Sequence, residues 1–389
     1  MLLSSRSMVR IILVSGSGGS GVTTLAAATA VAAAARGRRT LAYGLNPGLR
    51  LALDAEFASK PVNISDGLWA IEGHQRRDST DEFREWIMML LDWRGMEVEL
   101  AEDLAALPGM NHVGRLLELE SFVDSGDYDA VVVDAAPLTQ FLDLPPALDA
   151  SARWLARLFA PRQANVLEPF LRVFAGDYAS AGEDVLERGR ELLGRLARLR
   201  DLFADPEVSS VRLAFRPDRE TQRSARHAAT VLTLFSWLVD AVVLNRMLPE
   251  GAGDPFLAPA RKRQTESLAA VQSALAPLPV LAMDLRPELA HGVAALSALA
   301  AEAYGDLDPL AVLHRSSPMS VSRNGASYVM TIHLPLAEAQ ELDLEETDEG
   351  VAVHVDGSRC LLPLPEDARH YDRASWALEN GVLKVVFDC

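Results

Sequence analysis

Short apolar runs recur along most of the chain, and longer helix-forming stretches separate them. The runs cover residues 11–14, 40–45, 128–133, 211–215, 241–244 and 278–283. Between them, an alanine-rich stretch covers residues 25–35, and apolar side chains at helical spacing recur over residues 63–125, 146–205 and 219–237. Buried strands that alternate with helices are typical of a doubly wound, mainly parallel sheet. We predict an α/β domain of this kind, with helical insertions over about 63–125 and 146–205.

The pattern changes at Ser316-Ser317-Pro318, where helical spacing gives way to an alternation of period two. The alternating apolar positions are Tyr328, Met330, Ile332, Leu334, Val351, Val353 and Val355. Asn380-Gly381, between two short apolar runs, is typical of a hairpin turn. We therefore predict a first domain over residues 1–315 and a small antiparallel β-sandwich over residues 318–389.

Composition and charge narrow the classes of function. The formal net charge of −17 argues against a nucleic-acid partner, which requires a basic face. No apolar stretch approaches the roughly 18–20 residues of a membrane span, and the first residues do not form an export signal. Cys360 and Cys389, which provide no metal-binding pair, are the only cysteines. A chain with only two cysteines is compatible with a reducing compartment. We therefore expect a cytoplasmic protein without a transmembrane segment.

The strongest local motif lies between the first apolar run and the alanine-rich stretch. It consists of Gly16, Ser17, Gly18, Gly19, Ser20, Gly21, Val22, Thr23 and Thr24. A strand, a glycine-rich turn and a helix form a phosphate-binding layout, because glycines let the backbone approach and the first N–H groups of the helix face the anion. The spacing is almost that of a P-loop. However, Val22 stands where a P-loop has the lysine that reaches the β- and γ-phosphates.

The same residues satisfy a second pattern, the Gly16-x-Gly18-x-x-Gly21 of dinucleotide-binding proteins. That pattern requires a carboxylate about 20 residues further on to bind the ribose. The next apolar run instead ends in Asn46-Pro47, with no acidic residue at its tip. A phosphate loop is therefore the better interpretation, and a glycine-rich connection without a ligand is the remaining alternative.

Two further residues follow strands at the edge where a doubly wound sheet presents side chains to a ligand. Asn46 stands where nucleotide hydrolases carry the group that positions the attacking water, and an amide cannot act as a base. Asp134 ends the run 128–133, where its carboxylate and the Thr23 hydroxyl are candidate ligands of Mg²⁺. Asp134 could instead cap the following turn, but its predicted place beside the phosphate loop favours the metal role.

Taken in this order, the motifs resemble those of the ArsA/Get family of deviant P-loop ATPases, and the resemblance runs nearly end to end. The family's Gly-Lys-Gly-Gly-Val-Gly-Lys-Thr-Thr matches residues 16–24. Its two switch segments, Asp-Pro-Ala and Asp-Thr-Ala-Pro, match Asn46-Pro47 and residues 134–137. Residues 242–246 resemble the strand whose asparagine, here Asn245, reads adenine. The resemblance implies that ATP or ADP binds with Mg²⁺ and that two subunits associate about a two-fold axis.

The last domain resembles the α-crystallin fold of small heat-shock proteins, as fused to one branch of this family. The best-matching segments are Tyr328-Val329-Met330, Leu334-Pro335 and residues 379–385. We expect this domain to lack the N-terminal arm and the Ile-x-Ile tail through which small heat-shock proteins assemble. We therefore do not expect large cage assemblies.

The departures from the family fall on catalytic parts. Val22 and Ser17 replace the two loop lysines, and Asn46 replaces the water-positioning aspartate. Loss of one preorganised charge typically costs about 10²–10³ in rate. We therefore expect a pseudo-ATPase that hydrolyses ATP slowly or not at all, acting as a scaffold or client-binding subunit with or without bound nucleotide. It would form a homodimer, or a heterodimer with an intact paralogue whose lysine enters this site.

Two alternatives stay open. In the first, the chain is an active ATPase that handles hydrophobic clients, such as tail-anchored proteins, or anions, and Arg10, Arg50 or Arg246 supplies the missing charge. In the second, it is chiefly a binding module for hydrophobic protein segments, which would bind the edge of the sandwich or the methionine-rich helices of residues 63–125. The aromatic and methionine side chains of that region, among them Trp69, Trp86 and Met88, are otherwise ordinary core residues.

Overall fold

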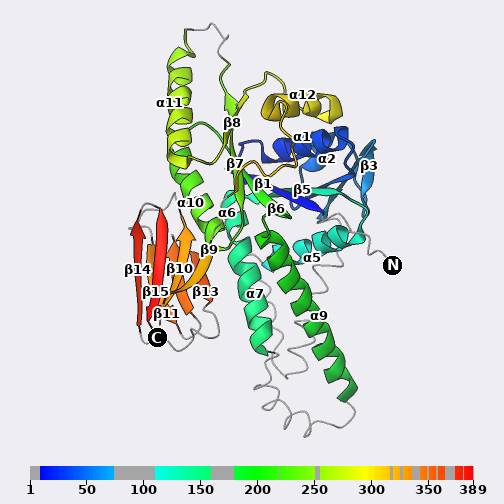
Figure 1. Ribbon diagram of the computed structural model, residues 1–389. Helices are drawn as coiled ribbons and strands as arrows, with labels where there is room; N and C mark the ends of the chain where they lie inside the picture. Colours follow the sequence, from blue (N-terminus) through cyan, green and yellow to red (C-terminus); the bar gives the residue numbers. More distant parts are fainter. Residues whose placement is uncertain are drawn as a thin grey trace, which may run out of the picture.

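The computed structural model describes residues 9–73, 110–158, 179–218, 220–249, 255–315, 319–324, 327–334, 342–347, 350–355, 358–363, 373–379 and 381–388. Its centre is an eight-stranded sheet with the order β3-β4-β2-β5-β1-β6-β7-β8 (Figure 1). The strands are β1 (Arg10–Gly16), β2 (Thr40–Gly44), β3 (Val62–Ser65), β4 (Leu68–Glu72), β5 (Ala130–Pro137), β6 (Ser209–Phe215), β7 (Val239–Met247) and β8 (Val280–Asp284). All neighbours are parallel except β3 and β4, which confirms the predicted doubly wound sheet.

Helices cover both faces of this sheet (Figure 1). On one face lie α1 (Val22–Ala35), α2 (Leu49–Leu53) and α12 (Gly292–Tyr304), which share a buried apolar cluster with the strands. The other face carries α5 (Met110–Ser125), α6 (Leu138–Leu142), α7 (Leu144–Leu158), α9 (Ala179–Ala204), α10 (Thr221–Leu234) and α11 (Ala258–Leu275). Because successive residues of a strand point to opposite faces, Ile11 and Leu13 join the second cluster whereas Ile12 and Val14 join the first.

The predicted helical insertion over residues 63–125 is wrong at its beginning. Residues 62–72 form the hairpin of β3 and β4 at the edge of the sheet, and Trp69 is a strand residue. Four apolar residues in a row, as in residues 68–71, are compatible with either a helix or a buried strand. Helix α5 agrees with the end of the prediction, whereas residues 74–109, with Trp86 and the methionines, lie outside the described residues. In the second insertion, α7 and α9 are helical as predicted, and residues 159–178 lie outside the described ranges.

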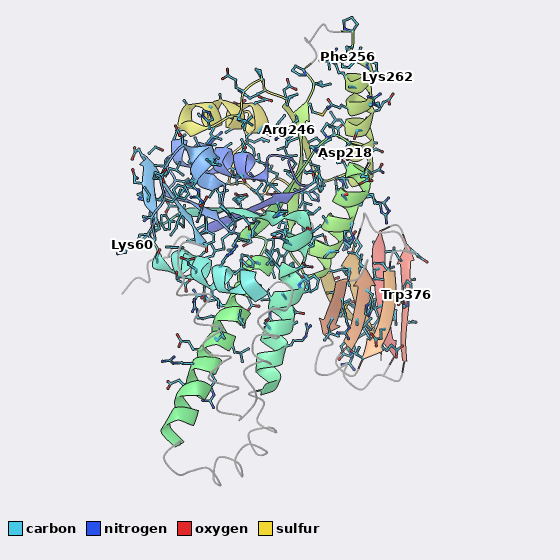
Figure 2. All side chains as sticks on the ribbon, turned by 180° about the vertical axis from the view of Figure 1, so that it is seen from behind. Lys60, Asp218, Arg246, Phe256, Lys262 and Trp376 are labelled. Carbon is cyan, nitrogen blue, oxygen red and sulfur yellow. The ribbon has the colours of Figure 1, made fainter. Side chains whose placement is uncertain are left out.

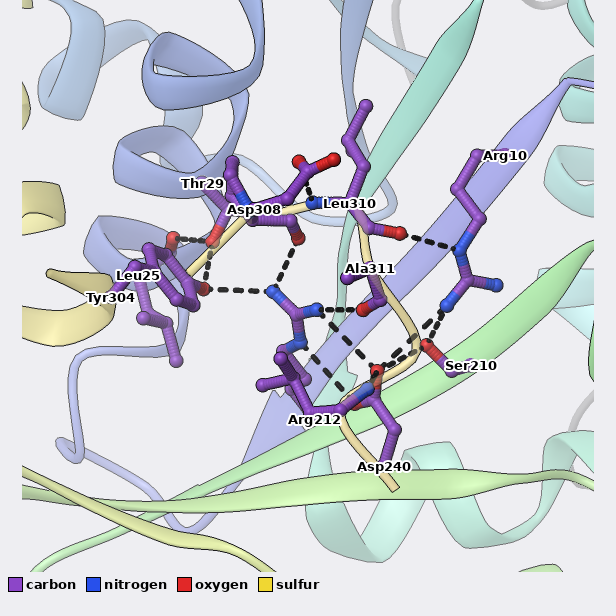
Figure 3. Close-up of polar contacts among 12 residues, drawn as sticks. Arg10, Leu25, Thr29, Ser210, Arg212, Asp240, Tyr304, Asp308, Leu310 and Ala311 are labelled. Atoms are coloured by element: carbon purple, nitrogen blue, oxygen red, sulfur yellow. Dashed lines mark hydrogen bonds and ion pairs between the residues drawn. The ribbon is translucent and has the colours of Figure 1, made fainter. Parts of the chain in front are cut away.

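A buried ionic network holds the segment after α12 against β6 and β7 (Figure 3). The fully buried Arg212 donates from Nε to Asp240 at 3.2 Å and from Nη1 to the Pro309 carbonyl at 2.7 Å. Its Nη1 also lies 3.1 Å from Oη of Tyr304. Arg10 adds a bond from Nε to the Leu310 carbonyl at 3.0 Å. The segment that leads out of the α/β domain is therefore fixed by charges inside it.

The last part of the chain is a sandwich of two antiparallel sheets, as predicted. The strands β9 (Met319–Asn324), β10 (Ser327–His333), β14 (Arg373–Glu379) and β15 (Val382–Asp388) form one sheet, in the order β14-β15-β10-β9. The other sheet consists of β11 (Leu342–Thr347), β12 (Gly350–Val355) and β13 (Ser358–Pro363). The sandwich packs beside α10, where Sγ of the buried Cys360 donates to the Leu234 carbonyl at 3.3 Å. Burial raises the pKa of the Cys360 thiol to about 12.

Candidate functional site

The glycine-rich loop connects β1 to α1 and lies across the end of β6. Ser17 donates its backbone N–H to the Ala214 carbonyl at 3.0 Å. A Cβ atom on Gly16 would lie 1.9 Å from that carbonyl oxygen, so only glycine fits there. Gly18 and Gly19 are exposed at the tip of the loop. The loop therefore presents its backbone at the edge of the sheet, as the sequence predicts for a phosphate loop.

Helix α1 begins at the end of this loop with its N–H groups directed toward it. Gly21, with φ of 85°, precedes the helix and takes a conformation that favours glycine. Val22 is partly buried and packs into the apolar cluster of α1, α2 and α12. Thr23 and Thr24 follow in the first turn. The helix therefore supplies the partial positive charge of its N-terminus but no lysine.

Asn245, at the end of β7, closes the loop from the other side. Its Nδ2 donates to the Ser20 carbonyl at 2.8 Å, and its Oδ1 accepts from the Arg246 N–H at 2.8 Å. A Cβ on Gly21 would lie 2.5 Å from the same Nδ2. The structure thus brings Asn245 to the loop, where its amide holds the Ser20 carbonyl.

Asp134 and Thr23, the two predicted metal ligands, lie side by side. The Thr23 hydroxyl is hydrogen-bonded to the Asp134 carboxylate, which is 2% exposed. Burial raises the pKa of Asp134 to about 7, the Thr23 hydrogen bond lowers it, and the nearby Glu72 carboxylate raises it further. A Cβ on Gly48 would lie 3.2 Å from Thr23 Oγ1, so the segment that begins at Asn46 packs against the same hydroxyl.

Glu72 is a second buried carboxylate at this site, and the sequence analysis missed it. The strand register places Glu72 on β4 and Asp134 on β5 on either side of Gly44 on β2. A Cβ on Gly44 would lie 3.1 Å from Glu72 Cγ, so glycine makes room for this side chain between the strands. Oε1 of Glu72 accepts the backbone N–H groups of Gly48 at 2.8 Å and Arg50 at 3.2 Å. Glu72 therefore holds the segment that follows Asn46.

The signal for Glu72 was present in the sequence. An acidic residue directly follows the apolar residues 68–71, just as Asp134 follows the run 128–133. The helical interpretation of this region hid the similarity, because a glutamate in a helix has no reason to reach the edge of the sheet.

Residues 16–24 contain no lysine or arginine. The chain has three lysines, Lys60, Lys262 and Lys384, and Figure 2 shows the first two on well-separated parts of the molecule. Arg50 Nε lies 3.6 Å from Glu72 Oε2, and Arg246 is exposed after Asn245. Arg10, proposed above as a substitute for the missing lysine, is excluded because it lies at the opposite end of β1 from the loop.

The side chains present fit a phosphate group and a divalent cation in part. Among the described residues, Oγ of Ser17, Oγ of Ser20 and Nδ2 of Asn46 are buried without a hydrogen-bond partner, and such atoms favour a polar ligand. Thr23 and Asp134 are oxygen ligands of the kind that Mg²⁺ takes alongside water and phosphate. In the described part of the chain, no three His, Cys, Asp or Glu side chains form a metal cluster. The loop thus combines unpartnered polar atoms with a buried carboxylate and carries no lysine.

Two families account for almost the whole chain. Residues 9–305 match the family described as anion-transporting ATPase (ArsA ATPase), and residues 325–387 match an HSP20-like domain found in ArsA. The described parts of the chain contain no helix long and apolar enough to cross a membrane.

Curated relatives agree over the same length. The chain is 25% identical over 390 residues to a putative arsenical pump-driving ATPase of Chlorobaculum tepidum, covering 98% of this chain and 96% of that protein. It is 25% identical over 402 residues to a putative arsenical pump-driving ATPase of Aquifex aeolicus, covering 97% and 99%. It is 30% identical over 398 residues to an uncharacterized protein of Streptomyces coelicolor, covering 97% of each. The chain therefore belongs to the ArsA ATPase family and carries the HSP20-like domain found in that family.

Proposed function

We propose that this protein is a pseudo-ATPase of the ArsA family, which binds nucleotide weakly or not at all and works in the cytoplasm as a scaffold or client-binding subunit. The observation that carries the proposal is the environment of position 22. A P-loop lysine at the start of α1 would reach the β- and γ-phosphates, whereas Val22 packs into the apolar cluster. Arg50 lies 3.6 Å from Glu72, and Arg246 is exposed.

The partners follow from the same site. A homodimer in the two-fold manner of the family would bring two loops together without either signature lysine, because Ser17 stands at that position. A heterodimer with an intact paralogue would supply one lysine to this chain's loop. A hydrophobic protein segment is the client that the helical part of this family fold suits. The two cysteines do not favour binding of an arsenical, because Cys360 is buried beneath α10 and its thiol has a pKa of about 12.

One observation favours the alternative of an active ATPase. Glu72 places a second carboxylate beside Asp134 and holds the segment 46–50. A carboxylate on another strand therefore contacts the segment in which Asn46 replaces the aspartate of the family. In an active enzyme, Thr23 and Asp134 would hold Mg²⁺, which would neutralise charge on the phosphates. Glu72 would then keep Asn46 beside the attacking water.

Restoring the lysine tests the proposal. We expect Val22→Lys to tighten the binding of Mg-ATP, measured by calorimetry, by about tenfold or more, because a charge-assisted hydrogen bond to phosphate adds roughly 1.5–3 kcal/mol. Val22→Met is the matched control, since it has similar length and no charge, and it should leave affinity unchanged. If Val22→Met tightens binding equally, or if the wild type already binds Mg-ATP as tightly as Val22→Lys does, charge at this position is not what the site lacks.

A further inference from the structure

The outer strand of the sandwich, β14, lies on the side turned away from the α/β domain (Figure 1). It is the end strand of its sheet, and no other described strand pairs with its outer side. Ser375, Trp376, Ala377 and Glu379 are exposed along it. Trp376 is 44% exposed, although the residue directly opposite it on β15, Val385, is buried. Because Trp376 is paired with Val385, it lies on the same face of its sheet as that buried residue, and Figure 2 shows it on the outer side of the sandwich.

Within its described residues, β14 lacks three of the usual protections against strand pairing, which are proline, lysine and a bulge. Natural sheets guard their edges with proline, with charged side chains (lysine above all), with bulges, by keeping the strand short, or by covering the edge with a helix or loop. The seven residues of β14, Arg-Ala-Ser-Trp-Ala-Leu-Glu, include neither proline nor lysine. Their register with β15 is continuous from Arg373 to Glu379, without a bulge. A strand of this kind is a template for another strand.

The geometry of the hairpin that joins β14 to β15 determines which backbone groups of β14 point away from β15. A two-residue turn joins Glu379 to Val382, so this pair exchanges ladder hydrogen bonds, and every second pair does the same. The intervening residues, Ala374, Trp376 and Leu378, therefore direct their backbone N–H and C=O groups outward. An incoming antiparallel strand must match these three positions.

The sequence of β14 is complementary to itself in that register. Antiparallel pairing centred on Trp376 places Trp376 opposite Trp376 of a second copy and Ala374 opposite its Leu378, so all outward-directed groups meet. The same register places the basic residue Arg373 opposite the acidic residue Glu379 of the second copy, once at each end. Opposite charges directly across two strands stabilise the pair. Hydrogen bonding, apolar surface and charge thus all favour one partner, which is an identical strand.

We propose that β14 is an interaction surface for a second copy of this chain, paired antiparallel about a two-fold axis through Trp376. The contact is isologous, since each copy contributes the same strand, and it joins two four-stranded sheets into one. It lies on the sandwich and does not require nucleotide, so it is separate from any association through the phosphate loops.

Sedimentation velocity of the full chain without nucleotide tests this contact. We expect a concentration-dependent dimer at micromolar concentration that Trp376→Lys converts to a monomer, since an edge lysine blocks strand pairing. Val321→Lys is the matched control, because Val321 is 42% exposed on the other end strand, β9, opposite the buried Met330. A wild type that stays monomeric would overturn the proposal. So would a dimer that Val321→Lys dissociates or that Trp376→Lys leaves intact.

A charge swap tests the register and does not depend on the tryptophan. Glu379→Arg alone places like charges opposite each other at both ends, and we expect self-association about tenfold weaker. Arg373→Glu in the same chain restores opposite charges, and affinity should return to within about twofold of the wild type. Thermal unfolding by circular dichroism checks that every variant is folded. If the double variant is weaker than the single one, the strands do not pair in this register.

Discussion

Two buried aspartates on neighbouring parts of one sheet have opposite surroundings. Asp240, on β7, is 0% exposed and lies 3.2 Å from Arg212 and 3.8 Å from Arg10, with a hydrogen bond from Ser210 at 2.9 Å. Asp134, on β5, is 2% exposed and has the Thr23 hydroxyl and the Glu72 carboxylate as neighbours. Among the described residues, no cation pairs with Asp134. One carboxylate is neutralised inside the protein, and the other is not.

This difference in surroundings indicates that the Asp240 carboxylate stabilises the fold, whereas the Asp134 carboxylate is suited to bind a ligand. The arginines that surround Asp240 fix the segment 305–315, so that charge is used within the fold (Figure 3). A buried carboxylate beside another carboxylate is costly unless a cation or a proton joins it. Under the proposed function, Asp134 is the carboxylate of the nucleotide site, and Val22 and Ser17 occupy the positions of the loop lysines.

Removing the carboxylate of Asp240 should have the largest effect on stability. Asp240→Asn leaves Arg212 and Arg10 buried without their counter-charge, and breaking a buried pair in this way costs about 3–5 kcal/mol. Urea unfolding followed by circular dichroism measures it. A loss below about 1 kcal/mol would mean that water reaches this network and that the contrast with Asp134 is overstated.

Removing the carboxylate of Asp134 should raise the free energy of unfolding, whereas removing that of Asp240 lowers it. Its pKa is about 7 in the folded protein, against an ordinary value of 3.8, so the unfolded chain releases this proton at lower pH than the folded one. Stability contributed by the protonated group is therefore lost as the pH rises from about 4 to 7. Asp134→Asn does not titrate, and we expect it to be more stable than the wild type by about 4 kcal/mol at pH 8, with little difference at pH 4. Equal differences in urea unfolding at the two pH values would contradict the shifted pKa.

The hydroxyl of Tyr304 should have the smallest effect. Its Oη lies 2.6 Å from Thr29 Oγ1 and 3.1 Å from Arg212 Nη1. Tyr304→Phe removes one neutral and one charge-assisted hydrogen bond from a network that keeps its ion pairs, so we expect a loss of about 1–2 kcal/mol. Combining it with Thr29→Val in a double-mutant cycle should show a coupling of at least about 0.5 kcal/mol. Additive losses would mean that the two hydroxyls do not support each other.

The sequence predicts the features that local patterns encode. Residues 16–24 lead from the end of β1 through a glycine-rich turn into α1, Asp134 lies on a buried strand beside Thr23, and the alternation after residue 318 forms a sandwich. It does not predict contacts between distant segments. The pairing of Arg212 with Asp240 and Tyr304 depends on how β6, β7 and α12 pack against one another. Nothing in the sequence of β6 or β7 indicates that Arg212 and Asp240 are partners.

Two errors had local causes that can be named. Glu72 was missed because four apolar residues before it were assigned to a helix rather than to β4. Arg10 cannot reach the site because it is the first residue of β1, whereas a parallel sheet presents ligands at the carboxyl ends of its strands. The direction of a predicted strand therefore decides which flanking charge can reach a site.

Calorimetric titration of the wild-type protein with ATP and Mg²⁺, run beside a phosphate-release assay, tests the central claim most directly. We predict heat of weak binding at the loop without release of phosphate, because neither loop lysine is present and Asn46 cannot act as a base. Steady release of phosphate that Asp134→Asn abolishes would contradict this account and would establish an active ATPase that hydrolyses ATP without either loop lysine.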